Sequence, residues 1–225
     1  MMYSRFLRIL APFFEDPAVC EVCNTRKRKS YGLCEECLKE LIICPSKAEM
    51  PWLEEKVFPI YTYGVYNKLI QTWYREFKFH GQFALAESFS ALLLDALRYF
   101  YEIAPFSWVS YIPMSPKKEY FRGYNPVREM AERASRQMRV PCFPVLEKVR
   151  NTREQNKVSR QERIKNVENS FRVCQTPAGS GVLVDDIFTS GHTMAEAMET
   201  LERIGISVYG VALFRSSMPP EEEKL

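Results

Sequence analysis

Two adjacent aspartates follow an apolar run in the stretch "VLVDDIFTSGHT", and a loop of small hydroxyl residues comes directly after them. The run from Val182 to Val184 is typical of a central strand in a parallel sheet, which is buried on both faces. Because ligands of such sheets bind beyond the carboxyl ends of the strands, we expect Asp185 and Asp186 to stand at a ligand site.

The loop after the aspartates has the composition of a phosphate site. We expect a turn into a helix over residues 194–204, formed by Thr189, Ser190, Gly191, His192 and Thr193. Backbone N–H groups at a helix start favour an anion, and a glycine lets the chain approach it closely. Two carboxylates beside this cradle could accept hydrogen bonds from two ribose hydroxyls, and one could help to position magnesium. The pattern therefore favours a sugar phosphate, with an ordinary strand-to-helix turn as the alternative.

Four cysteines near the start form a second chemical motif. Their spacing is C-x2-C-x10-C-x2-C, over Cys20, Cys23, Cys34 and Cys37. Two such knuckles can present four thiolates to one tetrahedral zinc ion. Disulfides are the alternative, but they would require an oxidising compartment for which the sequence carries no signal. Cys44 is a spare, substitute ligand.

Basic residues are concentrated in the middle of the chain. The net charge is only +3, yet residues 115–172 hold 15 Lys and Arg against 7 Asp and Glu. Such an excess favours an anionic partner, either the phosphates of a small molecule or those of a nucleic acid, unless it is simply a solvated helix face. The run "RKRK" over residues 26–29, inside the cysteine motif, is a weaker indication of nucleic-acid contact.

Strand and helix patterns alternate along the rest of the chain and predict a doubly wound α/β domain. We expect strands over residues 106–113, 145–149, 181–186 and 206–214, and helices over 67–81, 82–101, 126–138 and 194–204. A proline-containing linker is expected over 44–55, a short strand pair or hairpin over 57–66, and a polar, basic loop over 114–125. Asn125 should cap the third of these helices, with Pro126 in its first turn.

The first fourteen residues are apolar with two arginines, but they lack a long apolar core and a cleavage site. We therefore expect a cytoplasmic protein without a secretory signal. A short amphipathic helix there would pack on its own domain or, less favourably, lie on the inner face of a membrane.

Five segments together resemble the ComF (competence protein F, GntX-like) family, in the family's order and over nearly the whole chain. They are "CEVCNTRKRKSYGLCEEC", "YREFKFHG", "IPMSPKKEYFRGYNPVREMA", "NTREQNKVSRQERIKNV" and "VLVDDIFTSGHT". The last one resembles the phosphoribosyl diphosphate (PRPP) loop of type I phosphoribosyltransferases. One departure is Pro126, where the family more often has glutamine.

The resemblance implies a type I phosphoribosyltransferase-like parallel sheet flanked by helices, over residues 56–225, with a zinc finger and linker over 1–55. It also implies that magnesium-bound PRPP places its 5'-phosphate on residues 189–193 and its ribose on Asp185 and Asp186. Its diphosphate would then face Ser115, Lys117, Lys118 and Arg122. Residues 151–166 resemble the mobile lid of such enzymes, with a plain solvated loop as the alternative.

The family is associated with uptake of single-stranded DNA during natural competence, which implies DNA-uptake partners such as a competence helicase. Two functions stay open. One is a true phosphoribosyltransferase of nucleotide metabolism that transfers phosphoribose to a base or an amine, although no residue identifies the acceptor. The other is a nucleic-acid handling module that keeps the PRPP fold as a ligand or regulatory site. It would bind single-stranded DNA weakly through phosphate contacts and base stacking, with Tyr120, Phe121 and Tyr124 as platforms.

Overall fold

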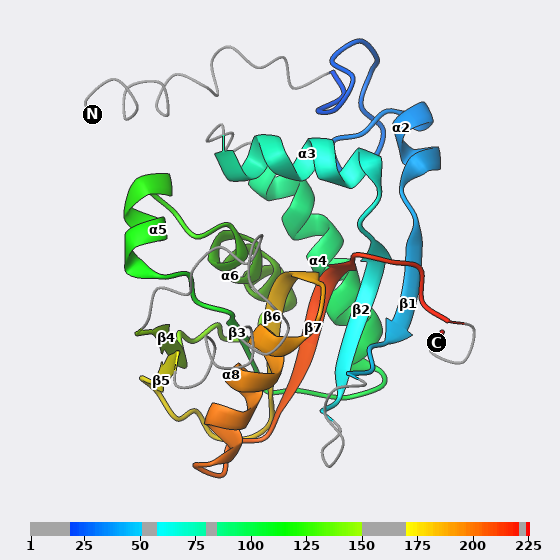
Figure 1. Ribbon diagram of the computed structural model, residues 1–225. Helices are drawn as coiled ribbons and strands as arrows, with labels where there is room; N and C mark the ends of the chain where they lie inside the picture. The colour runs from blue at the N-terminus through cyan, green and yellow to red at the C-terminus, as the bar shows by residue number, and fades with distance from the viewer. Residues whose placement is uncertain (1–18, 51–57, 80–84, 150–169, 221–223) are drawn as a thin grey trace.

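A computed structural model describes residues 19–50, 58–79, 85–149, 170–220 and 224–225 (Figure 1). Its helices are α2 (Glu35–Glu40), α3 (Lys68–Phe79), α4 (Leu85–Tyr101), α5 (Pro116–Arg122), α6 (Pro126–Met138) and α8 (His192–Glu202). Its strands are β1 (Ile43–Lys47), β2 (Ile60–Val65), β3 (Trp108–Tyr111), β4 (Leu146–Lys148), β5 (Phe171–Val173), β6 (Gly181–Phe188) and β7 (Val208–Arg215).

The main sheet has five strands in the order β1-β2-β7-β6-β3. Strands β2, β7, β6 and β3 are parallel, and β1 is an antiparallel edge strand. A separate antiparallel pair joins β4 to β5. This arrangement confirms the predicted α/β class, a mostly parallel sheet flanked by helices.

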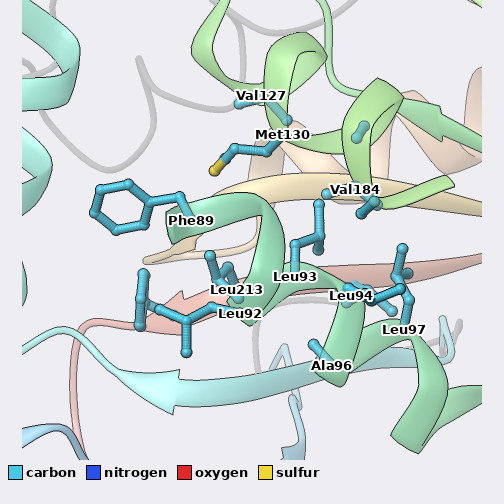
Figure 2. Packing of buried hydrophobic residues seen from close by; sticks show 14 of the residues in the cluster. Phe89, Leu92, Leu93, Leu94, Ala96, Leu97, Val127, Met130, Val184 and Leu213 are labelled. Atoms are coloured by element: carbon cyan, nitrogen blue, oxygen red, sulfur yellow. The ribbon is translucent and has the colours of Figure 1, made fainter. Parts of the chain in front are cut away.

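Side chains alternate between the two faces of the sheet. On β6, Val182 and Val184 belong to a cluster with α3, α4 and α6, whereas Leu183 belongs to a second cluster with α8. Figure 2 shows part of the first cluster, including Leu93 of α4, Met130 of α6 and Val184 of β6. Since residues of a strand point alternately to opposite faces, we expect Asp185 and Asp186, which follow on the same strand, to face opposite sides of the sheet.

Helix boundaries follow from local chemistry. The side chain of Asn125 accepts hydrogen bonds from the N–H groups of Val127 and Arg128, and Pro126 stands in the first turn of α6, as predicted. The predicted loop over 114–125 is wrong in part, because it contains α5. Ser115 caps the start of this helix, and Gly123 ends it with a φ of 80°, in the left-handed region.

Two predictions before α3 are also wrong. Residues 57–66 do not form a hairpin of their own; β2 pairs instead with β7 and with β1. The segment expected to be a linker begins with β1, the edge strand of the main sheet. This strand carries Pro45 beside a register shift in its pairing with β2. A proline is tolerated in an edge strand, where its missing N–H faces no partner strand.

The described helices include none that is long and apolar enough to cross a membrane. Several predictions fall outside the described residues: the N-terminal amphipathic stretch over 1–14, the domain boundary between 55 and 56, and the lid over 151–166.

Candidate functional site

The aspartates lie within β6, as predicted, but the strand continues for two residues beyond Asp186. Pairing with β3 ends at Val184, whereas pairing with β7 continues to Phe188. The part of β6 that carries the acids therefore pairs with β7 on one side, and no strand among the described residues pairs with it on the side that β3 has left. This geometry leaves space for a ligand beside Asp185 at the carboxyl end of the sheet.

Asp186 is tied to α3. Its Oδ2 accepts a hydrogen bond from the hydroxyl of Tyr74 at 2.7 Å and forms an ion pair with Lys78 Nζ at 2.5 Å. Its Oδ1 accepts from the N–H of Ile187 at 2.6 Å. Burial raises the pKa of this carboxyl, but the Lys78 charge and these hydrogen bonds outweigh burial and hold the pKa below its ordinary value. Asp186 is thus an ionised carboxylate anchored to the protein.

Asp185 has a different environment. Its Oδ1 accepts a hydrogen bond from the N–H of Asp186 at 2.8 Å, and its side chain lines a hollow in front of α8. Burial raises its pKa well above the ordinary range, and the adjacent Asp186 charge raises it further. Lys78 opposes this shift in part. The pair therefore divides into an ionised Asp186 and an Asp185 that holds its proton to higher pH.

The hollow beside Asp185 contains the whole predicted phosphate loop. Besides Asp185 it is lined by Ile187, Phe188, Thr189, Ser190, Gly191, His192, Thr193, Met194 and Ala212. The loop is braced internally, because Nδ1 of the buried His192 lies 2.8 Å from Ser190 Oγ. Since α8 begins at His192, its first turn is directed at this hollow. Such an end of a helix favours a negatively charged group.

Position 191 requires a glycine for two reasons, its backbone conformation and the lack of space for a side chain. Its φ is +76°, in the left-handed region, and it caps the start of α8. A Cβ at this position would meet Met50 Sδ at 2.7 Å and the Phe188 ring at 2.8 Å. A larger residue would therefore collide with the protein itself, and not only with a ligand in the loop.

The predicted diphosphate residues lie on and before α5, which follows the carboxyl end of β3. Ser115 is buried and its hydroxyl accepts the N–H of Lys118, so it acts as a helix cap. Lys117 and Lys118 are exposed, and Arg122 is half-buried with Nη1 4.0 Å from Met114 Sδ. Burial raises the pKa of Tyr74, and the charge of Arg122 opposes this shift in part. Its electrostatic influence thus reaches the tyrosine that holds Asp186.

The predicted stacking residues separate into two kinds. Tyr120 and Phe121 are 69% and 72% exposed on α5. Tyr124 is buried, and its hydroxyl donates a hydrogen bond to the carbonyl of Phe77. Tyr124 is therefore wrong as a stacking platform, because the αL turn at Gly123 directs it into the core.

The four predicted metal ligands come together. Their sulfur atoms all lie within 4.8 Å of one another, and the Cys23 and Cys34 sulfurs are 3.8 Å apart. Thiolates around a tetrahedral zinc ion, at a Zn–S distance of about 2.3 Å, are about 3.8 Å apart. Hydrogen bonds from Thr25 lower the pKa of Cys23 to about 6, whereas burial raises the pKa of Cys37, so the two thiols differ in how readily they form the thiolate that binds metals. All seven cysteines are free thiols, and Cys44 lies outside the cluster.

The cysteine segment is packed into the main core rather than set apart. Glu21, between two of the cysteines, has a 2% exposed side chain that forms an ion pair with Arg28 at 2.9 Å. It also accepts hydrogen bonds from Trp73 of α3 and Ser88 of α4. Part of the "RKRK" run is therefore used internally, which weakens the case for nucleic-acid contact there.

Sequence reasoning missed Glu21, Tyr74 and Lys78. Tyr74 and Lys78 are four residues apart on the helix and so share a face, a spacing that could have indicated a joint partner. Lys148 of β4 was missed as well; burial lowers its pKa, and the charge of Asp185 opposes this shift. No signal in the sequence relates Lys148 to Asp185, because only the tertiary fold brings β4 to this edge.

Comparison with known proteins identifies a matching domain family and similar proteins of named function. The family description "Phosphoribosyl transferase domain" matches residues 128–224. Competence protein F of Haemophilus influenzae is 26% identical over 86% of this chain and 90% of its own length. Competence protein ComFC of Streptococcus pneumoniae is 28% identical, covering 85% and 84% respectively. DNA utilization protein YhgH of Escherichia coli O157:H7 is 25% identical, covering 86% and 88%.

Solved structures of phosphoribosyltransferases are also similar. Adenine phosphoribosyltransferase from Saccharomyces cerevisiae shares 12% identity, with 59% of this chain and 69% of that chain covered and a TM-score of 0.38.

Proposed function

The chain is a ComF/YhgH-family protein with a phosphoribosyltransferase domain, and from this premise we propose that it binds magnesium and PRPP together and acts in the handling of single-stranded DNA during uptake. The observation that supports binding most directly is the hollow that Asp185 shares with residues 187–194 at the start of α8. It combines a carboxylate, hydroxyl side chains and a helix start within one cavity.

In this proposal each part of PRPP meets a suitable group. The 5'-phosphate lies on the loop from Thr189 to Thr193, and the ribose hydroxyls meet the acid pair of β6. The diphosphate faces the cations of α5. A magnesium ion bound with PRPP would supply positive charge beside the diphosphate. The zinc of the cysteine cluster would stabilise the segment that packs on α3.

Binding can be tested on the purified protein by thermal unfolding with magnesium, PRPP, or both. A ligand that binds only the folded state stabilises it by about 2.7 kcal/mol at a concentration one hundred times its dissociation constant. We expect the combination to raise the melting temperature and magnesium alone to do much less. No shift with the combination would contradict the proposal.

The DNA part of the proposal is supported by α5. Two exposed aromatic rings, Tyr120 and Phe121, lie beside the exposed Lys117 and Lys118 on a helix without a buried residue. Aromatic faces and cations together suit a single strand, which offers bases for stacking and phosphates for ion pairing. The competence and DNA utilization proteins named above align with most of this chain, which supports the same context.

Turnover is a separate question from binding. A phosphoribosyltransferase stabilises the positive charge that develops on the sugar when diphosphate departs, and carboxylates near the ribose with cations near the diphosphate provide both effects. The anchored Asp186 and the cations of α5 are compatible with that role. The test is to mix the protein with PRPP and each member of a panel of bases and amines. Release of diphosphate with one of these acceptors would establish the alternative function, a true phosphoribosyltransferase.

A further inference from the structure

Helix α5 begins at the same end of the sheet as the hollow. The N–H of Ile112 donates a hydrogen bond to the carbonyl of Val184 at 2.8 Å, where β6 reaches the acid pair. The chain leaves the sheet at this point and enters α5 through a short connection. Glu119 of α5 then forms an ion pair with Arg128 Nη1 of α6 at 2.9 Å. These contacts hold α5 beside the carboxyl end of the sheet.

The cations of α5 are connected electrostatically to the hollow through a lysine of β4. Burial lowers the pKa of Lys148, the charges of Asp185 and Glu196 oppose this shift, and the charge of Lys118 adds to it. Lys148 is therefore within electrostatic range both of an acid that lines the hollow and of a lysine on α5. Since like charges repel, an anion bound in the hollow opposes a second anion on α5.

The exposed side of α5 combines aromatic rings with cations. Tyr120 and Phe121 are largely exposed. Residues three or four positions apart are neighbours on a helix, so Lys117 lies beside both rings and Lys118 lies beside Phe121. A base stacked on either ring therefore brings its phosphate close to the two lysines. These are the same lysines that face the diphosphate in the proposed binding of PRPP.

We propose that magnesium-PRPP and single-stranded DNA compete for Lys117 and Lys118, so that PRPP controls whether the protein holds DNA. This inference rests on the proposed function, which gives the diphosphate and the DNA phosphates the same cations. Each ligand also has contacts of its own: the phosphate loop belongs to PRPP, and the two rings of α5 belong to DNA. The competition is therefore confined to the lysines, where each bound anion leaves less positive charge for the other.

Fluorescence anisotropy of a labelled oligonucleotide on the full chain, with and without saturating magnesium-PRPP, measures the competition. Two phosphate contacts contribute a salt slope of about 1.4, which corresponds to about tenfold in affinity at about 0.15 M salt. We expect magnesium-PRPP to weaken DNA binding by about that factor and to reduce the slope by about 1.4. Sodium sulfate at equal ionic strength is the control for salt alone. Because coupling between two ligands is reciprocal, DNA should weaken PRPP binding by the same factor.

Variants of the lysines locate the competition. Lys117→Ala with Lys118→Ala should weaken DNA binding by about tenfold without PRPP, and magnesium-PRPP should weaken it no further. Lys68→Ala with Arg75→Ala removes two exposed cations of α3 and is the control matched in charge. This control should keep the full effect of magnesium-PRPP, because the competition depends on α5 and not on the net charge of the protein.

Variants of the separate contacts test whether the two ligands are otherwise independent. Tyr120→Ala with Phe121→Ala should weaken DNA binding but leave the affinity for magnesium-PRPP unchanged. Thr189→Glu places a carboxylate at an exposed position of the phosphate loop, where it repels the 5'-phosphate. It should abolish the effect of magnesium-PRPP on DNA binding, with the affinity of the same variant without PRPP as its reference. Melting temperatures verify that each variant is folded.

The outcomes separate this inference from the proposed function. If the unaltered chain fails to bind either magnesium-PRPP or the oligonucleotide, the proposed function fails and the competition with it. If the chain binds both, but saturating magnesium-PRPP leaves the DNA affinity and the salt slope unchanged, only the competition is overturned. It is likewise overturned if magnesium-PRPP weakens DNA binding of the double lysine variant as much as that of the unaltered chain.

Discussion

Trp73 donates a hydrogen bond from Nε1 to Glu21 Oε2 at 3.0 Å, and the next residue of α3, Tyr74, donates one to Asp186. One turn of helix thus contacts both the cysteine segment and the acid pair. Because adjacent residues of α3 make the two contacts, the helix is a direct physical connection between these parts of the described fold.

Replacing Glu21 tests how firmly the cysteine segment is docked. Its carboxylate is buried against Arg28, Trp73 and Ser88, so Glu21→Ala leaves a cation and two donors without their acceptor. We expect a loss of about 3 kcal/mol in the free energy of unfolding, measured with urea. Glu35→Ala is the control. Its ion pair with Lys29 spans 3.6 Å between exposed side chains, and its loss should cost less than about 1 kcal/mol.

Metal content tests the cysteine cluster. Protein purified without a chelator should contain about one zinc ion per chain. Cys20→Ser should lower that content and the melting temperature, because Cys20 is a buried member of the cluster. Cys44→Ser, outside the cluster, should change neither. Metal-free protein with the four thiols joined as disulfides would contradict the assignment.

Asp185→Asn should stabilise the ligand-free protein near neutral pH. The pKa of Asp185 is raised in the folded state, so the folded state binds a proton that the unfolded state has lost. The free energy of unfolding then falls as pH rises from the ordinary aspartate range to the raised folded pKa. Asparagine keeps an oxygen for the Asp186 N–H and has no proton to lose.

Thermal melts of this variant and the unaltered chain should coincide at about pH 3, below the ordinary aspartate pKa of about 3.9, and diverge above it in favour of asparagine. Asp186→Asn is the informative contrast. It removes the acceptor of the Lys78 ion pair and should lower the melting temperature at neutral pH. Equal effects of the two substitutions would contradict the assignment of different protonation states.

How much of this site was predictable depends on the range of each interaction. The apolar run, the acids and the glycine loop are local patterns, so the sequence located β6 and the hollow beside it. The bond between Tyr74 and Asp186 spans 112 positions, and no local pattern encodes it. The length of β6 was underestimated for a related reason. The predicted strand ended at Asp186, because two charged residues usually end a strand, but pairing with β7 continues through Ile187 and Phe188.

The same distinction explains α5. Its residues are polar and basic, which favours a loop, but the cap at Ser115 and the turn at Gly123 are sufficient for a short helix. Whether Tyr124 points outward was beyond local reasoning, because its burial depends on Phe77 of α3.

Substitutions on α5 test the contact with single-stranded DNA. Tyr120→Ala and Phe121→Ala should each weaken binding by about 1–3 kcal/mol, the usual value of one base stacked on an aromatic ring. The melting temperature should stay the same, since α5 buries no residue. Tyr101→Ala on α4, an aromatic residue exposed to 39%, is the control and should not alter binding. Fluorescence anisotropy with a labelled oligonucleotide measures the affinities.

Lys117→Ala with Lys118→Ala should flatten the salt dependence of the same binding. Each phosphate contact contributes a slope of about 0.7 log units per log unit of salt for single strands. Equal affinities and slopes for all α5 variants would exclude this helix as the DNA surface.

Gly191 and Gly205 form a matched pair for testing the loop at α8. Both have a left-handed φ, +76° and +78°, so alanine should cost about 1–2 kcal/mol at either position. At Gly205 nothing lies within 4 Å of the added Cβ, whereas at Gly191 Met50 and Phe188 lie within 2.8 Å. Gly191→Ala should therefore lower the free energy of unfolding further, by about 1–3 kcal/mol, the usual cost of overpacking. Urea unfolding of the ligand-free protein measures both losses. Equal losses at the two positions would contradict the expected collision with Met50 and Phe188, and would leave ligand binding as the reason for a glycine at position 191.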